Sequence, residues 1–440
     1  MTSVALTEWQ RLGPSEQETL RHRSLSAQAR ELARRLGDGR ALEVTELRDG
    51  LSLRSSSFVG RVRFDDLTIT IRPKLAPRVL LRLFRYAYGL RDLELIDPTV
   101  EGETGDLLHD LLIAQLRAEA RELLERGLVR HYVRHHEWLG SPRGRVDMPA
   151  LARAGGLWQA ALPCHHHPRS TDFILHQVLA SGLFLAAQIA SDRVLRGTVA
   201  RLAKDYAERA GPVPLSESVL GEATRAINRL TSAYEPAIRL VILLYRAQGL
   251  LLDDAPRSAV HLPGFLFDMN RFFQALVARL LRDHLPDHDV EEEKSLRDMI
   301  QFVPGRNPRG RAAPRPRPDF VVRRRTRLVA LLDAKYRDLW ERSLPREMLY
   351  QLGIYALSQP LGGKAAIIYP TASAEAREAT LALNEPLEGR TRAYVELRPL
   401  DLAGLADALE RRDRGACEGM ARRVAFGAEG PAGVLRSVAG

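Results

Sequence analysis

Two acidic residues and one lysine near position 330 form the group of side chains best suited to chemistry in this sequence. Asp319 follows Pro318, and Asp333-Ala334-Lys335 follows a segment with the pattern of a short β-hairpin. Because strand side chains alternate between the two faces of a sheet, Asp333 and Lys335 are expected on one face. If the two strands pair antiparallel, Asp319 begins the first and Asp333 ends the second. The sequence therefore predicts both carboxylates at one edge of a sheet.

Carboxylate oxygens in this arrangement are suitable ligands for a hard divalent cation such as Mg²⁺. A magnesium ion held by Asp319 and Asp333 would polarise a phosphoryl oxygen and lower the pKa of a bound water molecule. Lys335 would orient that water or stabilise developing negative charge. The group thus predicts hydrolysis of a phosphodiester backbone.

The alternative is that Asp319 caps a turn and that Asp333 and Lys335 lie at the solvated end of a strand. An apolar run over residues 328–332 directly precedes Asp333. A carboxylate at the end of a buried strand is costly unless it is paired or bound to a metal, which weakens this alternative.

A helix predicted over residues 347–357 would place Gln351 and Tyr355, four residues apart, on one helix face. Gln351 could hydrogen-bond a metal-bound water or a phosphate, and Tyr355 could steady the strand that carries Lys335 or contact DNA. Alone, this spacing is also typical of an ordinary helix surface. We add Gln351 and Tyr355 to Asp319, Asp333 and Lys335 as candidate catalytic residues.

Arginines are concentrated on both sides of the acidic residues. Guanidinium groups suit contacts with phosphates, which position DNA without reading its bases. The alternative is a solvated, charged loop. The candidate DNA-binding residues are Arg315 and Arg317, which precede Asp319, and Arg323, Arg324 and Arg325, which lie in the turn of the hairpin.

The composition is that of a folded protein with several domains. The 440 residues are 45% hydrophobic and 27% charged, which argues against disorder or a fibrous repeat. The net charge of +10 favours a polyanionic partner, although arginine-rich composition can also reflect a GC-rich genome. The sequence shows neither a signal peptide nor an apolar run of about 18 residues, so we expect a soluble, cytoplasmic protein.

Cysteine and histidine are arranged in ways that exclude several metal centres. Two cysteines, Cys164 and Cys417, cannot form a disulfide framework, a four-cysteine zinc site or an iron–sulfur cluster. The run from Cys164 to His167 resembles a metal cluster, but consecutive residues rarely converge on one ion, which favours a structural role. The remaining histidines of interest, His131, His135 and His136, are expected on the surface or facing DNA and not as ligands.

Hydrophobic periodicity predicts a mixed α/β (α+β) fold. The first part of the chain is expected to contain a β-hairpin with one solvated face and several helices, the middle is expected to be mostly helical, and the last third is expected to hold a central mixed sheet flanked by helices. The predicted helices are 15–37, 79–88, 106–132, 174–189, 226–251, 270–285 and 347–357, and the predicted strands are 58–64, 67–71, 289–293, 319–322, 328–333, 365–369 and 392–397.

The order and spacing of Pro318-Asp319, Asp333-Ala334-Lys335 and Gln351…Tyr355 resemble the PD-(D/E)xK nuclease superfamily, in the branch that carries a QxxxY helix. Other segments between residues 45 and 370 resemble the McrC family, the nuclease subunit of the McrBC modification-dependent restriction system. These segments are Ile71-Arg72-Pro73-Lys74, Arg126-Gly127-Leu128 with Tyr132, Gly144-Arg145-Val146-Asp147, and Cys164 followed by Ser170-Thr171-Asp172.

This resemblance implies an Mg²⁺-dependent DNA endonuclease that works in antiviral defence with an AAA+ GTPase or ATPase subunit resembling McrB. The chain has no G-x-x-x-x-G-K-[ST] motif of its own, so it should not hydrolyse nucleotide. By resemblance, residues 45–145 would insert into the partner ring and stimulate its hydrolysis; the alternative is that the hairpin only packs on its own helices. Candidate basic groups for this role are Arg61, Arg63, Arg72 and Lys74.

Turn signals at residues 140–144 and at Pro263-Gly264, together with the resemblance, predict a division of the chain into five parts. These are a helical extension (1–40), a partner-binding domain (41–145), a mostly helical middle domain (146–262), the PD-(D/E)xK nuclease domain (263–400) and a helical C-terminal extension (401–440).

One position departs from the family pattern. The first helix of the nuclease fold usually carries an acidic residue, and this sequence has Gln274 there. Glu291, Glu292 or Glu293 could substitute for it. The departure leaves open a non-catalytic regulator of an AAA+ ring. A stand-alone repair-type nuclease of the same superfamily is a second, separate alternative.

Overall fold

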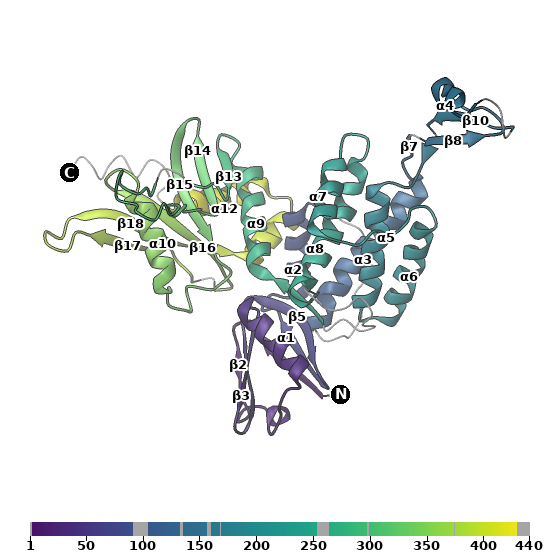
Figure 1. Ribbon diagram of the computed structural model, residues 1–440. Coiled ribbons are helices and arrows are strands. Elements are labelled where there is room, and N and C mark those ends of the chain that lie inside the picture. The colour runs from purple at the N-terminus through teal and green to yellow at the C-terminus, as the bar shows by residue number, and fades with distance from the viewer. Residues whose placement is uncertain are drawn as a thin grey trace. The chain divides into compact units, whose positions relative to one another are not determined.

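The computed structural model describes residues 2–90, 104–132, 135–155, 160–167, 169–252, 264–296, 299–373 and 375–428. Two compact units are present, one formed by Met1–Asp92 with Leu266–Gly440 and the other by Leu93–Phe265 (Figure 1). The fold is a mixed α/β fold, as predicted from the sequence. Parts of all five predicted domains lie outside the described residues, the longest being 91–103, 253–263 and 429–440, and the five-part division stays a prediction.

The first unit begins with a four-stranded sheet built around the predicted hairpin. β6 runs antiparallel to β5 and parallel to β1, so β6 is paired on both edges. The prediction that one face of this hairpin is solvated is wrong, because Thr68 and Thr70 on that face are only 5% and 6% exposed. The strands are β1 (Thr2–Thr7), β6 (Leu67–Arg72), β5 (Phe58–Phe64) and β12 (Gly264–Asp268), in that spatial order.

The helix predicted over residues 15–37 is wrong in its first half. α1 covers Ala27–Asp38, because the Ser26 side chain accepts a hydrogen bond from the Ala29 amide and caps the helix there. Before this cap, only Glu18–Leu20 form a 3-10 turn, and Leu20 is fully buried. The expected helical extension is therefore partly strand. A second sheet contains β2 (Arg11–Leu12), β4 (Gly50–Ser55) and β3 (Leu42–Leu47), and α2 (Pro77–Tyr88) follows β6 as predicted.

A six-stranded mixed sheet forms the other part of the first unit, as the sequence predicted for the last third of the chain. Its hairpin strands are antiparallel, and β15, β16 and β18 are parallel to one another. The strands, in spatial order, are β13 (Asp289–Glu292), β14 (Phe320–Arg324), β15 (Arg327–Ala334), β16 (Gly363–Thr371), β18 (Thr391–Asp401) and β17 (Ala379–Asn384).

One face of this sheet packs against α10 (Arg346–Leu357), which lies along the sheet in Figure 1. Leu352 and Tyr355 of α10 share a buried core with Val321 of β14 and Leu331 of β15. Strand side chains alternate, so Asp319 lies on the same face as Val321, and Asp333 on the same face as Leu331. The other helices of this part are α9 (Met269–His284), α11 (Leu402–Glu410) and α12 (Arg414–Phe426).

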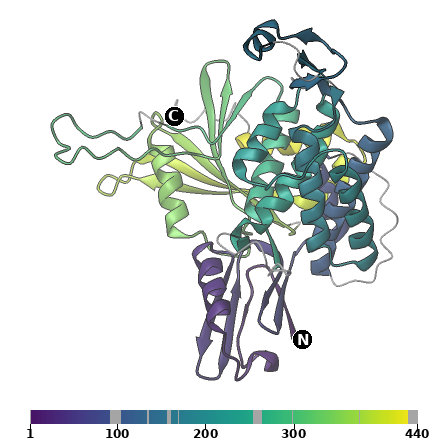
Figure 2. The ribbon, with the colours of Figure 1, turned by 45° about the vertical axis from the view of Figure 1, so that its right-hand side comes forward.

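The second unit is a bundle of helices whose members run side by side in Figures 1 and 2. The helix predicted over 226–251 begins later, at Glu235, because Asn228 and Thr231 bond to each other and to the Ala226 carbonyl in a loop that ends the preceding helix. The helices are α3 (Thr104–Arg126), α5 (Ile174–Ile189), α6 (Arg193–Ala207), α7 (Glu217–Ala226) and α8 (Glu235–Leu252).

A small β region interrupts the bundle between α3 and α5, which the expectation of a mostly helical middle section did not include. It lies beyond the ends of the bundle helices in both views (Figures 1 and 2). Its elements are β7 (His131–Tyr132), β8 (His135–Leu139), β9 (Arg145–Val146), α4 (Met148–Arg153), β10 (Leu162–His166) and β11 (Arg169–Ser170).

No helix among the described residues has both the length and the apolar character needed to cross a membrane.

Gly182 allows α5 and α8 to approach closely. A Cβ atom at Gly182 would lie 2.3 Å from Cγ2 of Val241 and 2.6 Å from its Cγ1, and valine has little freedom to move away. We expect Gly182→Ala to destabilise the protein by about 1–3 kcal/mol, because the overpacking outweighs the better helix propensity of alanine. The matched control is Gly197→Ala in α6, where a Cβ meets nothing within 4 Å. That variant should be about 0.5–1 kcal/mol more stable than the wild type in urea unfolding. Equal effects of the two substitutions would contradict the close approach.

Candidate functional site

The hairpin of β14 and β15 brings Asp319 and Asp333 together. Phe320, directly after Asp319, is opposite Leu332, directly before Asp333. The Asp319 amide donates to Oδ1 of Asp333 at 3.2 Å, and the Ala334 amide donates to Oδ2 of Asp319 at 2.8 Å. Each aspartate is thus held by the backbone of the other strand, which places both carboxylates at one end of the hairpin.

The surroundings of these carboxylates disfavour two negative charges. Asp333 is only 2% exposed, and burial together with the charge of Asp319 raises its pKa to about 6. Burial also raises the pKa of Asp319 above its ordinary value, although Lys335 opposes that change. The pair therefore carries an electrostatic cost that a bound cation would relieve.

Lys335 supplies a positive charge next to the pair. Its amide donates to the Ile368 carbonyl at 3.0 Å, which extends the pairing of β15 with β16 by one residue beyond Ala334. Lys335 therefore lies on the face of Asp333. Its Nζ is 3.7 Å from Oδ2 of Asp319, a distance that leaves the ammonium able to approach another anion.

Gln351 and Tyr355 of α10 form a connected pair under the sheet. Gln351 Nε2 donates to the Tyr355 hydroxyl at 3.0 Å, and Tyr355 is 2% exposed. Burial raises the pKa of Tyr355, and the nearby charges of Asp333 and Asp319 raise it further. The tyrosine therefore belongs to the environment of the two aspartates.

Gln274 of α9 reaches the same group of side chains. Its Nε2 is 3.4 Å from Oδ1 of Asp319 and 3.4 Å from Oε1 of Glu293. The charge of Glu293 contributes to the raised pKa of Asp319. Glu293 has a left-handed backbone (φ 46°), and its amide donates to the Asp319 carbonyl at 3.0 Å. The third carboxylate of the site is therefore Glu293.

The other two glutamates left open by the sequence face different partners. Glu291 pairs with Lys294 and Glu292 with Arg282. The sequence could not show which of these three glutamates joins the acidic site, because that depends on the direction of the backbone directly after β13.

The five candidate arginines form two groups at opposite ends of the hairpin. Arg315 and Arg317 are exposed and directly precede the aspartates, whereas Arg324 and Arg325 are exposed at the hairpin turn. With about five residues per strand, the turn lies roughly 17 Å from the carboxylates. Arg323 is half-buried and lies 3.9 Å from Glu291. The structure therefore brings two of the five candidates next to the acidic site.

The donor set fits a magnesium ion. Asp319, Asp333 and Glu293 offer only oxygen atoms, which Mg²⁺ prefers. Burial raises the pKa of both aspartates, and the charge of a neighbouring carboxylate adds to this effect in each case, while Lys335 opposes it. Asp319 and Asp333 remain the residues that would hold the ion, with Glu293 added to them.

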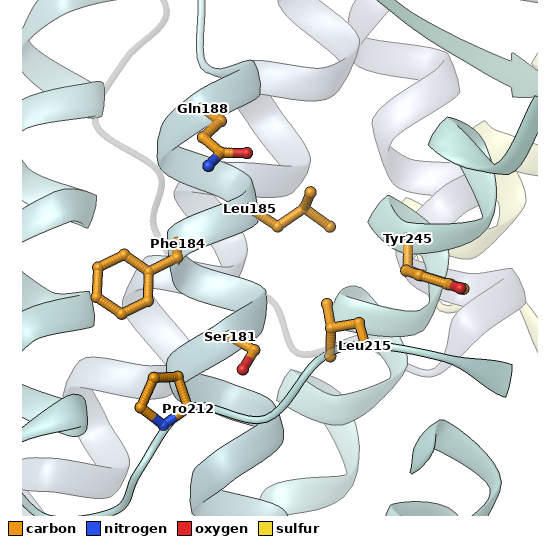
Figure 3. A pocket seen from close by; sticks show the side chains of 7 residues that line it. All are labelled: Ser181, Phe184, Leu185, Gln188, Pro212, Leu215 and Tyr245. Carbon is orange, nitrogen blue, oxygen red and sulfur yellow. The ribbon is translucent and has the colours of Figure 1, made fainter. Parts of the chain in front are cut away.

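A separate pocket of about 300 Å³ lies on the helical unit between α5 and α8 (Figure 3). Its walls are mostly apolar, and it contains neither a charged side chain nor a histidine. The pocket therefore offers no carboxylate or imidazole to hold a metal ion. The lining residues are Ser181, Phe184, Leu185, Gln188, Pro212, Leu215 and Tyr245.

Comparison with known proteins identifies the family. The family described as McrBC 5-methylcytosine restriction system component matches residues 53–370. No curated protein matches the chain.

Two solved structures from Thermococcus gammatolerans resemble the chain. One is the refined half-complex from the tetradecameric assembly of McrB AAA+ hexamers with bound McrC, at 19% identity and a TM-score of 0.59, with coverage of 94% of this chain and 99% of that chain. The other is the cryo-EM structure of the McrBC complex, at 17% identity and a TM-score of 0.46, with coverage of 64% and 88%. The first likeness shows a shared fold. Because the family match spans well over half of the 440 residues, this chain belongs to the McrBC family, as its sequence resemblance predicted.

Proposed function

We propose that this protein is the Mg²⁺-dependent DNA endonuclease subunit of an McrBC-like restriction system and that it stimulates an AAA+ NTPase partner. The observation that carries the nuclease part is the reciprocal backbone bonding of Asp319 and Asp333 beside Lys335. A hairpin with no chemical role gains nothing from a buried carboxylate next to a half-buried one, because their mutual repulsion and desolvation cost stability.

The side chains have distinct roles in this proposal. Asp319, Asp333 and Glu293 would hold Mg²⁺, which when bound would polarise the scissile phosphate and acidify a water molecule. Lys335 donates to the attacking water or to a phosphate oxygen on which charge develops. Gln351 fixes the Tyr355 hydroxyl, and the buried tyrosine ring holds α10 against the strands that carry the aspartates. Arg315 and Arg317 contact the DNA backbone next to the site.

The partner is proposed from the family and the shared fold. The similar structure with a TM-score of 0.59 contains McrB AAA+ hexamers with bound McrC, and its alignment covers 94% of this chain. A chain with the McrC fold and a nuclease site would cut DNA that a translocating ring brings to it. We therefore expect DNA and an McrB-like GTPase or ATPase as partners and the cytoplasm as the compartment.

A plasmid assay tests the proposal. Methylated and unmethylated plasmids are incubated with the chain, Mg²⁺ and nucleotide, with and without an McrB-like subunit encoded next to it. Cleavage that requires both the partner and Mg²⁺ is expected. Digestion of linear DNA without a partner would favour a stand-alone repair-type nuclease. Stimulated nucleotide hydrolysis without any cleavage would favour the non-catalytic ring regulator, which Gln274 at the usual acidic position makes a specific alternative.

Glu293 gives a graded test of the metal site. We expect Glu293→Gln to weaken Mg²⁺ binding about tenfold, because it removes one negative charge next to Asp319. The Mg²⁺ concentration for half-maximal cleavage should rise by a similar factor. Glu292→Gln is the matched control, since Glu292 pairs with Arg282. An unchanged magnesium requirement in Glu293→Gln would exclude Glu293 from the site.

A further inference from the structure

A second cluster of metal-ligating side chains lies in the small β region of the helical unit. His136 of β8 and His165 of β10 are directly opposite each other in an antiparallel pair. Asp147 follows β9, which pairs with the other edge of β10. The three side chains therefore come from three adjacent strand segments, and one ligand atom from each lies within 4.8 Å of the other two.

The ring nitrogens of both histidines converge on a single oxygen. Nε2 of His165 is 3.0 Å and Nε2 of His136 is 3.3 Å from Oδ2 of Asp147. The two imidazole rings are stacked, with centroids 4.2 Å apart and planes inclined by 18°. Around a tetrahedral ion with bonds of 2.0–2.1 Å, neighbouring ligand atoms are about 3.3 Å apart. Both distances to Asp147 are close to this separation.

The backbone fixes Asp147 in this position. Its amide donates to the Pro163 carbonyl at 2.7 Å, and its Oδ1 accepts from the Ala150 amide at 3.0 Å at the start of α4. The bond from Ala150 is the main reason that the pKa of Asp147 lies below its ordinary value. The hydrogen bond from Ala150 to Oδ1 leaves Oδ2 of Asp147 directed at the histidines. Carboxylates that bind metals are usually held by hydrogen bonds of this kind.

Gly144 makes the close approach of this segment to β10 possible. It has φ +70°, and a Cβ there would lie 2.3 Å from the His165 carbonyl oxygen. A side chain at position 144 would push the loop that leads to Asp147 away from His165. The backbone around the cluster is therefore specialised for bringing these two residues together.

The small β region has little hydrophobic core. Among its described residues between 135 and 170, only Pro163 and Cys164 are buried. Cys164 points to the face opposite His165, since the two are adjacent in one strand. Regions this small that lack a core are commonly held together by a disulfide or a metal, and the described cysteines, Cys164 included, are free.

We propose that His136, Asp147 and His165 bind a Zn²⁺ ion that holds β8, β9 and β10 together. Two imidazoles and one carboxylate are a common zinc ligand set, and the fourth position is left to water or to a group from a partner. Sequence reasoning did not predict His136 and His165 as ligands, because it considered only residues close together in the chain. The cluster depends on strand pairing that places these two histidines, 29 positions apart, opposite each other.

Zinc binding to the tag-free, full-length chain tests this proposal. After removal of metals with a chelator, equilibrium dialysis followed by elemental analysis should find one more zinc per chain in the wild type than in His136→Asn or His165→Asn. The matched control is His166→Asn. His166 follows His165 but faces the other side of the strand, where it contacts Glu137. It should keep the wild-type zinc content, and the comparison cancels any zinc held by the aspartates near Lys335.

Cobalt provides a second readout that does not depend on counting ions. Co²⁺ in the wild type should give the visible absorption of a four-coordinate, imidazole-bound ion, and His136→Asn should lose it. The His136 side chain is 46% exposed, so this variant should fold. Wild-type zinc content in both His136→Asn and His165→Asn, or an equal loss in His166→Asn, overturns the proposal. A cobalt-loaded wild type whose X-ray absorption shows no imidazole ligands overturns it as well.

Discussion

Asp333→Asn is expected to reduce DNA cleavage by about a thousandfold or more. The substitution keeps the size and the hydrogen-bond acceptor of the side chain, so the Asp319 amide can still bond to it, but it removes one of the charges proposed to hold Mg²⁺. Removing one preorganised electrostatic contact from an active site costs roughly a hundredfold to a thousandfold, and losing a metal ligand should cost at least as much. Plasmid cleavage at saturating Mg²⁺ with the partner present measures the effect.

The stability of Asp333→Asn separates lost chemistry from lost folding. Burial raises the pKa of Asp333 to about 6 in the folded protein from an ordinary value of 3.8. Ionisation is therefore easier in the unfolded chain, and this group costs stability progressively as the pH rises from about 4 to about 6. Asparagine removes that cost. The variant should unfold at the same or a higher temperature than the wild type at pH 8 without metal, and it should still stimulate the partner's nucleotide hydrolysis.

Matched substitutions sharpen this test. Lys335→Ala should lose cleavage to a similar degree while retaining Mg²⁺ binding, because the ammonium is proposed to act on the water or the phosphate and not on the metal. Asp289→Asn changes an exposed carboxylate on β13 and should cleave like the wild type. Full cleavage by Asp333→Asn or Lys335→Ala would remove the roles assigned to these residues.

The parts of the site that the sequence predicted are those set by local pairing. The strands around residues 323–327 are joined by a short turn, which is why the sequence predicts an antiparallel hairpin. The register shifts between Val322 and Arg323, where β15 has one extra residue, and this shift puts Asp319 opposite Asp333. Gln351 and Tyr355 lie one helical turn apart, so they meet wherever the helix packs. Local patterns therefore indicate the hairpin with its two aspartates and the pair on the helix, whereas the packing that brings Tyr355 near the aspartates joins residues distant in sequence.

The features that sequence reasoning missed depend on contacts between distant residues. β1 pairs in parallel with β6, about 65 positions later. The few residues of β1 form too short a hydrophobic pattern to indicate this partner. β17 is an edge strand whose residues are mostly exposed, so it lacks the apolar pattern that reveals a strand. The choice of Glu293 over its two neighbours follows from one left-handed residue at the end of β13, which residue types alone do not specify.

Glu8 gives the second large expected effect, on stability. Glu8 is 2% exposed, and the Tyr336 hydroxyl donates to its Oε1 at 3.3 Å. Burial raises the pKa of Glu8 from 4.5 to about 8. At pH 7 the folded protein therefore holds this carboxyl protonated, whereas the unfolded chain releases the proton. The free energy of unfolding of the wild type therefore falls progressively as the pH rises from about 4.5 to about 8.

We therefore expect Glu8→Gln to be more stable than the wild type at pH 7 by up to about 3 kcal/mol, which is the free energy of 2.5 pH units. The amide is neutral at every pH and can still accept the Tyr336 hydroxyl. The gain should shrink toward zero at pH 4.5, where the glutamate is neutral in the folded state and becomes neutral in the unfolded chain. Urea unfolding at several pH values measures it, with Glu18→Gln, an exposed position, as the control.

The same substitution probes how the N-terminal sheet supports the candidate site. Tyr336 directly follows Lys335 and is held at two points. Its amide donates to Oδ1 of Asn270 at 3.2 Å, and its hydroxyl donates to Glu8. These two bonds fix the backbone directly after Lys335. Because the bond from Tyr336 survives in Glu8→Gln, cleavage at pH 7 should stay near the wild-type level. Glu8→Ala leaves the tyrosine hydroxyl without that partner in a buried site, so stability and cleavage should both fall. Equal pH dependence of unfolding in the wild type and Glu8→Gln would show that Glu8 is ionised in the folded protein.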